Sequence, residues 1–132
     1  MLAVEGGTSP RELTVLLVED EVLTRLMLAD ELRSQGLQVL EASNADEALT
    51  VLHSSLPVHL LFTDIRMPGE MDGVALAKFA HARFPGIKSI IGSSGQPESI
   101  GDFADAFLAK PYDLRELAEQ VRRLLGESDY EQ

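Results

Sequence analysis

The feature of this sequence that most restricts its fold is the regular alternation of short apolar runs with stretches of helical periodicity. TVLLV (14–18) is a continuous run of β-favouring residues, which is typical of a strand buried on both faces. Four further short runs are also predicted to be strands, of which LQVLEA (37–42) is a weaker one. The segments between them repeat apolar residues three and four positions apart, as helices do. The predicted strands cover residues 14–18, 37–42, 58–63, 87–92 and 106–109.

The predicted helices fill the connections between these strands. Asn44 and Asp113 each precede a helical stretch and are followed three residues later by a glutamate, Glu47 or Glu116, which is a capping-box arrangement. Only residues 94–109 separate Ser93 from Lys110, so the helix expected after the fourth strand is short or irregular. The predicted helical segments are about 21–35, the stretch after Asn44, 72–84, a short segment near 97–103, and the stretch after Asp113.

Strand–helix repetition of this kind requires crossover connections and a parallel sheet that is covered on both faces. The sequence therefore predicts the α/β class, with a doubly wound five-stranded parallel sheet of order 2-1-3-4-5 in the flavodoxin-like (βα)5 arrangement. We expect one domain over residues 13–126, with a flexible N-terminal tail at 1–12 and a C-terminal tail at 127–132.

Composition restricts the possible partners and compartment. The formal net charge of −11 argues against direct binding to nucleic acid or to an anionic membrane. The chain has no cysteine, so neither disulfides nor thiol chemistry are available to it. No apolar run reaches the ~18–20 residues of a membrane-spanning helix, and no signal peptide is recognisable. We therefore expect a cytoplasmic protein without membrane insertion.

Acidic residues follow two strands that are neighbours in the predicted order. Glu19 and Asp20 follow the first strand and Asp64 ends the third, which places all three at the sheet edge where doubly wound folds bind ligands. Taken singly, Glu19-Asp20-Glu21 is equally well read as a helix start, and Asp64 as a turn residue. Together the three carboxylates repel one another unless a cation neutralises them, and Mg2+ prefers such oxygen ligands.

Two further groups are predicted at the same edge. Ser93-Ser94 end the fourth strand, and their hydroxyls can donate to an oxyanion. Lys110, one of only three lysines, ends the fifth strand, where it can pair with Asp64 or bind a phosphoryl oxygen. In isolation each is better explained as a turn serine or a solvated lysine, but their convergence with the acids favours a common site.

The combination of Glu19-Asp20 after TVLLV, Asp64 in TDIRMPGEMDG, Ser93-Ser94 and Lys110-Pro111 resembles the receiver domain of two-component response regulators. The resemblance covers about residues 13–126, and it is of the chemotaxis type, in which the receiver stands alone. It implies that the protein acts by binding a partner or by passing a phosphoryl group on. It implies a phosphoacceptor that assists its own phosphorylation and dephosphorylation, and not an enzyme in the ordinary sense.

The resemblance also implies a role for each residue. Asp64 would form an aspartyl phosphate. Asp20, Asp64 and the backbone carbonyl of Arg66 would ligate Mg2+, with Glu19 acting mainly through a metal-bound water. Lys110 would neutralise the phosphoryl group. Ser93 would be the switch hydroxyl and Phe107 the switch aromatic, although an aromatic residue on a short strand is equally expected in the core.

The partners implied are a histidine kinase or histidine phosphotransfer protein, an unknown downstream protein, and possibly a second copy in a homodimer. The alternatives are a receiver-like interaction scaffold that is never phosphorylated and an Asp-nucleophile phosphatase. Arg66 stands where such a phosphatase needs its second aspartate. A nucleotide- or flavin-binding module is disfavoured because the loop after the first strand is acidic and has no glycine-rich motif. Glu70, an extra acid in the turn after Asp64, has no assigned role.

Overall fold

A computed structural model describes residues 13–94 and 103–126 of the chain. Five strands form one sheet of order β3-β2-β4-β5-β6, and every neighbouring pair is parallel. This is the predicted order 2-1-3-4-5, so the predicted fold class is confirmed. The strands are β2 (Thr14–Val18), β3 (Gln38–Ala42), β4 (Leu60–Asp64), β5 (Lys88–Ser93) and β6 (Ala106–Ala109).

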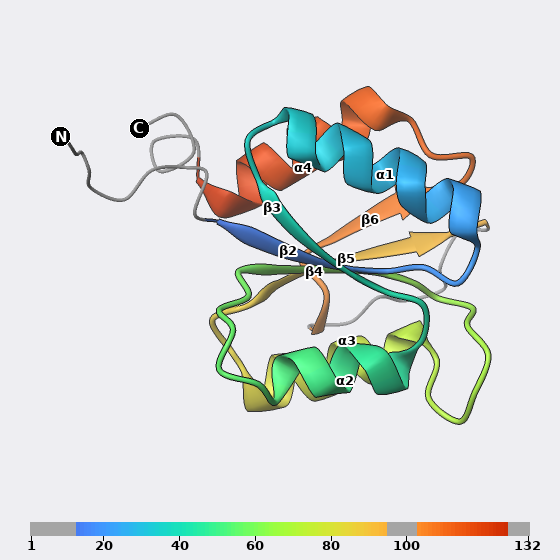
Figure 1. Ribbon diagram of the computed structural model, residues 1–132, viewed down its shortest axis with the longest axis vertical. Helices are drawn as coiled ribbons and strands as arrows, with labels where there is room; N and C mark the ends of the chain where they lie inside the picture. The colour runs from blue at the N-terminus through green and yellow to red at the C-terminus, as the bar shows by residue number, and fades with distance from the viewer. Residues whose placement is uncertain (1–12, 95–102, 127–132) are drawn as a thin grey trace, which may run out of the picture.

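Four helices cover the two faces of the sheet in the described part of the chain. Figure 1 shows α1 (Val22–Ser34) and α4 (Leu114–Leu125) on one face, and α2 (Ala45–Leu52) and α3 (Gly73–Arg83) on the other. The sheet thus lies between two apolar layers. Phe62 and Leu17 are fully buried on the α1/α4 side, and Leu16 and Leu61 are fully buried on the α2/α3 side.

Two inner strands of the sheet, β2 and β4, are buried along their whole length, which explains why their sequences are mainly apolar runs. Every residue of β2 and of β4 is buried, including Asp64. A strand covered on both faces needs no alternation of polar and apolar residues. The third strand begins at Leu60 and not at residue 58 as predicted, because sheet pairing with β2 starts at Val15 opposite Leu60.

Each helix begins at a residue whose side chain accepts a backbone hydrogen bond. Asn44 and Asp113 cap α2 and α4 as predicted. The capping box at Asn44 differs from the expected one, since the Glu47 carboxylate accepts from the backbone N–H of Ser43 at 2.7 Å. At α1 the capping residue is Glu21. Glu19 and Asp20 therefore do not cap this helix.

Several predictions fall outside the described residues. These are the tails at 1–12 and 127–132, most of the helical segment near 97–103, and the length of the helix expected after the fourth strand. None of the helices that the structure describes is long and apolar enough to cross a membrane. β2 begins and α4 ends at the same edge of the sheet, on the left in Figure 1, and the carboxyl ends of the strands lie at the other edge.

Candidate phosphoryl and metal site at the carboxyl edge of the sheet

The three predicted acids come together at the carboxyl ends of β2 and β4. Glu19 follows β2 directly and Asp64 is the last residue of β4, and these strands pair in register with Val18 opposite Thr63. Carboxylate oxygens of Glu19, Asp20 and Asp64 all lie within 4.8 Å of one another. Glu19 and Asp64 are buried and Asp20 is exposed, so the cluster has a closed base and an open side.

Lys110 bonds directly to the central acid. Its Nζ lies 2.7 Å from Oδ2 of Asp64, and the backbone N–H of Arg66 donates to Oδ1 at 3.2 Å. Burial disfavours the charged ammonium, yet the hydrogen bond and charge of Asp64, with the charges of Glu19 and Asp20, raise the pKa of Lys110. Lys110 therefore stays protonated, and one positive charge faces three acids.

Glu19 is the acid that most needs a cation. Its side chain is buried, with 1% of the residue exposed. Oε2 accepts the backbone N–H of Glu21 at 3.1 Å, whereas Oε1 is buried without a hydrogen-bond partner among the described residues. Burial, reinforced by the charge of Asp64, raises the pKa of Glu19 to about 7. An oxygen-preferring dication fits this donor set, because it would favour the ionised carboxylate, and a water bound to it could give the unpaired oxygen a hydrogen-bond partner.

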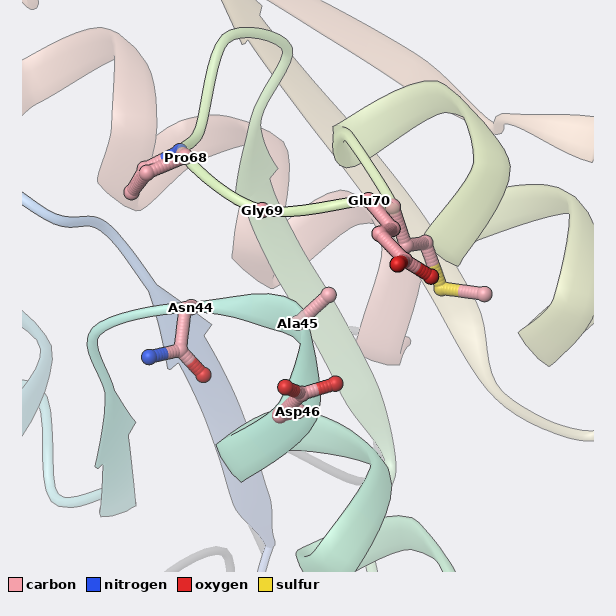
Figure 2. A pocket seen from close by; sticks show the side chains of 7 residues that line it. Asn44, Ala45, Asp46, Pro68, Gly69 and Glu70 are labelled. Atoms are coloured by element: carbon pink, nitrogen blue, oxygen red, sulfur yellow. The ribbon is translucent and has the colours of Figure 1, made fainter.

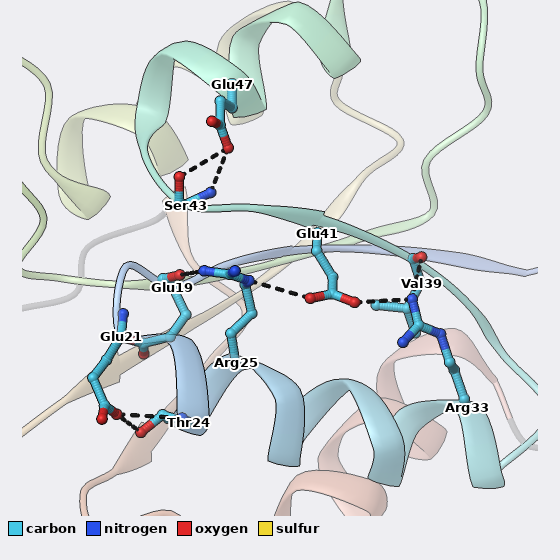
Figure 3. Close-up of polar contacts among 9 residues, drawn as sticks. All are labelled: Glu19, Glu21, Thr24, Arg25, Arg33, Val39, Glu41, Ser43 and Glu47. Atoms are coloured by element: carbon cyan, nitrogen blue, oxygen red, sulfur yellow. Dashed lines mark hydrogen bonds and ion pairs between the residues drawn. The ribbon is translucent and has the colours of Figure 1, made fainter.

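An arginine holds the loop that carries Glu19. Figure 3 shows Arg25 of α1 between Glu19 and Glu41: its guanidinium donates to the backbone carbonyl of Glu19 at 2.9 Å and contacts the Glu41 carboxylate at 3.2 Å. Glu41 also pairs with Arg33 at 3.0 Å. These contacts tie α1, β3 and the loop after β2 into one unit, so the backbone position of Glu19 is fixed from behind.

A glycine brings the start of α3 against the backbone of Asp64. The N–H of Gly73 donates to the carbonyl of Ile65 at 2.9 Å. A Cβ at Gly73 would lie 1.9 Å from the carbonyl oxygen of Asp64, so no other residue fits at this position without moving the backbone. Asp72 caps the same helix, as predicted.

Tyr112 and Gly92 belong to the site, although the sequence analysis did not single them out. The Tyr112 ring packs edge-on against Phe62, with centroids 5.4 Å apart, and lies 5.7 Å from Nζ of Lys110. A Cβ at Gly92 would be 2.1 Å from the Tyr112 hydroxyl oxygen. Gly92 is the register partner of Asp64, so this hydroxyl lies beside the acid. A glycine inside a strand signals such a close approach.

Ser93 and Phe107 do not line the cavity at this edge. The side of Gly92 that would carry a Cβ faces Tyr112, so strand alternation turns Ser93 to the opposite face. Phe107 pairs with Ile91 and is half-buried between the buried Ala106 and Leu108. Its neighbours point into the α1/α4 core, so Phe107 points to the other face. The switch roles predicted for the two residues remain predictions.

The acids open into a cavity of about 730 Å3. It is lined by Glu19, Asp20, Glu21, Thr24, Met27, Asp64, Arg66, Lys110, Pro111 and Tyr112. A smaller cavity of about 160 Å3 lies between the start of α2 and the loop that follows β4. Figure 2 shows Glu70, the extra acid of that loop, at its border together with Asp46 of α2. Glu70 therefore lies outside the acidic cluster.

The fold and site define a doubly wound α/β domain in which a buried aspartate, bonded to a lysine and grouped with two further acids, lies at the carboxyl edge of the parallel sheet. The model of the response regulator receiver domain matches residues 15–122, and the chain belongs to this family.

Curated relatives agree with this assignment. The receiver protein CpdR of Brucella abortus is 33% identical, with 84% of this chain and 95% of CpdR covered. The sensor kinase CckA of the same organism is 35% identical, covering 88% of this chain and 13% of CckA. The transcriptional regulatory protein AruR of Pseudomonas aeruginosa is 34% identical, and the match covers 84% of this chain and 48% of AruR. The chain thus spans half or less of the last two.

Solved structures show the same fold. A CheY-like receiver from Methanospirillum hungatei superposes with a TM-score of 0.79 at 28% identity, covering 87% of this chain and 94% of the other. The response regulator TrrA of Thermotoga maritima was solved in complex with Mg2+ and BeF. It superposes with a TM-score of 0.77 at 29% identity, and the match covers 85% of this chain and 98% of TrrA.

Proposed function

We propose that Asp64 accepts a phosphoryl group from a phosphohistidine in a Mg2+-dependent reaction. The observation that carries the proposal is the 2.7 Å contact between Lys110 and a buried carboxylate that two other acids surround. An oxygen of Asp64 would form the new bond to phosphorus as the P–N bond breaks, and the histidine leaves as the neutral imidazole once it takes up a proton. The proposed product is an aspartyl phosphate.

Mg2+ would be held by Asp20, Asp64 and the backbone carbonyl of Arg66, with Glu19 acting through a metal-bound water. When bound, it neutralises charge on the acids and on the transferred oxygens. The unpaired oxygen of Glu19 and the hard oxygen donors support this assignment. The relative TrrA, which was solved with Mg2+ and BeF, supports it independently.

The remaining residues would position the phosphoryl group and change conformation once it is bound to Asp64. Lys110 would move its ammonium from Asp64 to a phosphoryl oxygen, which keeps it paired with negative charge throughout. A hydroxyl at the end of β5 would donate to another oxygen. The sequence prediction gives this hydroxyl to Ser93, the last residue of β5, which would have to turn toward the phosphoryl group. Phe107 would then reorient, so that phosphorylation shifts an existing equilibrium and alters partner binding.

We infer that the donor is a protein, either a histidine kinase or a histidine phosphotransfer protein. Exposed apolar side chains lie on the first two turns of α1, next to the cavity that Thr24 and Met27 line; they are Val22, Leu23, Leu26 and Met27. This surface suits a protein that presents its phosphohistidine to Asp64. Leu23→Ser should slow phosphotransfer from such a protein and leave phosphorylation by acetyl phosphate unchanged.

The output is proposed to be binding of a further protein or a second copy of the domain, in the cytoplasm and without contact to nucleic acid. We further infer that the domain is not a turnover enzyme. Arg66 occupies the position at which an Asp-nucleophile phosphatase places its general acid, and its side chain is exposed. Multiple turnovers of phosphate esters would contradict this inference.

Incubation with acetyl phosphate and Mg2+ tests the proposal directly. The wild type should gain the mass of one phosphoryl group, and it should not do so after chelation of the metal. Asp64→Asn should stay unmodified, while Asp72→Asn, the same chemical change at a helix cap eight residues away, should still be phosphorylated. The proposal fails if Asp64→Asn and the wild type are modified equally or if neither is.

A further inference from the structure

The hydroxyl of Tyr112 is a buried donor at the edge of the acidic cavity for which the sheet makes special room. Its oxygen is shielded from solvent and has no hydrogen-bond partner among the described residues. Leaving a buried polar group unpaired is costly, and proteins rarely retain one without a reason. A phenylalanine would fill the same space without that cost.

The ring is held in a defined place. It packs edge-on against Phe62, which is fully buried, and follows Lys110-Pro111 directly in the chain. Its hydroxyl occupies the space that a side chain of β5 would otherwise fill, because position 92 is glycine. Gly92 pairs with Asp64, so the hydroxyl is held on the next strand at the level of the acid.

The electrostatic surroundings favour a neutral donor. Burial and the negative charges of Asp64 and Glu19 raise the pKa of Tyr112 well above its ordinary value, so the phenol keeps its proton at physiological pH. Lys110, which lies beside the ring, is already bonded to Asp64. An additional negative group on Asp64 would therefore meet one donor that is occupied at rest and one that is unpaired.

We propose that the Tyr112 hydroxyl donates a hydrogen bond to the phosphoryl group on Asp64, and that Gly92 is required to admit it. This inference rests on the proposed function, since it needs a phosphoryl group at Asp64. Tyr112 would thus act with Lys110 from the same short segment, and it would stabilise the phosphorylated form over the free form. The hydroxyl is unpaired in the free domain because, in this proposal, its hydrogen-bond partner is the phosphoryl group, which is absent there.

The test compares wild type with Tyr112→Phe, which removes only the hydroxyl. Beryllium chloride is titrated at fixed excess fluoride and Mg2+, and binding of the resulting phosphoryl mimic is followed by amide NMR shifts. A hydrogen bond to a charged group predicts an affinity about tenfold or more weaker in Tyr112→Phe. Thermal unfolding without beryllium should show the variant to be at least as stable as wild type, because an unpaired polar group has been removed.

Tyr130→Phe, the same change at the chain's other tyrosine and outside the described residues, serves as the matched control and should bind like wild type. Equal affinities for Tyr112→Phe and wild type would overturn the inference and leave the proposed function standing. Weaker binding together with a lower unfolding temperature of the free variant would also overturn it, since the hydroxyl would then be structural. Absence of binding by wild type would overturn the proposed function itself.

Discussion

At the scale of single residues, Glu19 links protonation of the site to stability of the fold. Its pKa of about 7 is caused first by burial and then by the charges of Asp64 and Asp20, against a value of 4.5 for an unperturbed glutamate. The folded state therefore binds this proton more tightly than the unfolded chain does. A group of this kind contributes its full stability below pH 4.5, and that stability is lost as pH rises through 7.

Without divalent cations, the free energy of unfolding should contain a component that falls between about pH 4.5 and 7. Glu19→Gln should remove it, because glutamine does not titrate, and the difference should be on the order of 1–3 kcal/mol across that range. Urea denaturation at several pH values measures it. Glu47 has a lowered pKa from hydrogen bonds to Ser43, so Glu47→Gln should leave this interval unaffected. Parallel curves for wild type and Glu19→Gln would contradict the prediction.

Gly73 is a second residue whose identity is fixed by its surroundings. In Gly73→Ala the new Cβ would lie 1.9 Å from the Asp64 carbonyl oxygen, and backbone cannot yield as a side chain does. We expect a loss of roughly 1–3 kcal/mol in the free energy of unfolding, together with weaker Mg2+ binding. Gly86→Ala is the matched control, because nothing lies within 4 Å of its Cβ position. Urea denaturation compares the two variants, and equal stabilities would contradict the packing argument.

At the scale of elements, the sequence was most informative where burial was most complete. β2 and β4 are buried throughout, so their apolar runs marked them, and the acids that follow were placed correctly by strand order alone. Contacts between distant segments were not predictable in this way. In the sequence, Tyr112 is simply the residue before Asp113, which caps α4. Only the folded structure shows that its hydroxyl lies against Gly92. Likewise, nothing local distinguishes Glu21, which caps α1, from the site residue Glu19.

The end of β5 yields a prediction about the switch hydroxyl. Ser93 is the last residue of β5, and Ser94 lies in the bend that follows it, where strand alternation no longer places side chains. We expect Ser93→Ala to slow phosphorylation by acetyl phosphate severalfold, because its hydroxyl would donate to a phosphoryl oxygen, and Ser94→Ala to have little effect. Intact-mass time courses at fixed Mg2+ measure both rates. The reverse pattern would transfer the assignment to Ser94.

The contacts between α1 and β3 predict a graded response. Arg25 bonds to both the Glu19 carbonyl and Glu41, whereas Arg33, which is more exposed, bonds to the Val39 carbonyl and Glu41. Arg25→Ala should weaken Mg2+ binding because the loop carrying Glu19 loses its fixed partner, and Arg33→Ala should not. Calorimetric titration with Mg2+ distinguishes them. Equal affinities in the two variants would show that the arginine does not position the acid.

At the scale of the whole molecule, a net charge of −11 acts on every cation that approaches. Specific binding must therefore be separated from general screening. Mg2+ at about 100 times its Kd should add about 2.7 kcal/mol to stability, seen as a higher unfolding temperature that a chelator reverses. Asp20→Asn should diminish this gain, whereas Asp46→Asn, which changes another exposed acid, on α2, should retain it. Equal gains in all three proteins would indicate screening alone.

The described domain begins with β2 and ends with α4 at one edge of the sheet, and the carboxyl ends of the strands lie at the opposite edge (Figure 1). The acids follow β2 and end β4, so they lie at that opposite edge. A surface, a fluorophore or another folded unit joined at either end of the domain would therefore stand away from the acidic cavity. Attachment at either end of the described domain should leave Asp64 open to a donor protein. The same arrangement allows phosphotransfer to be followed on a tethered chain.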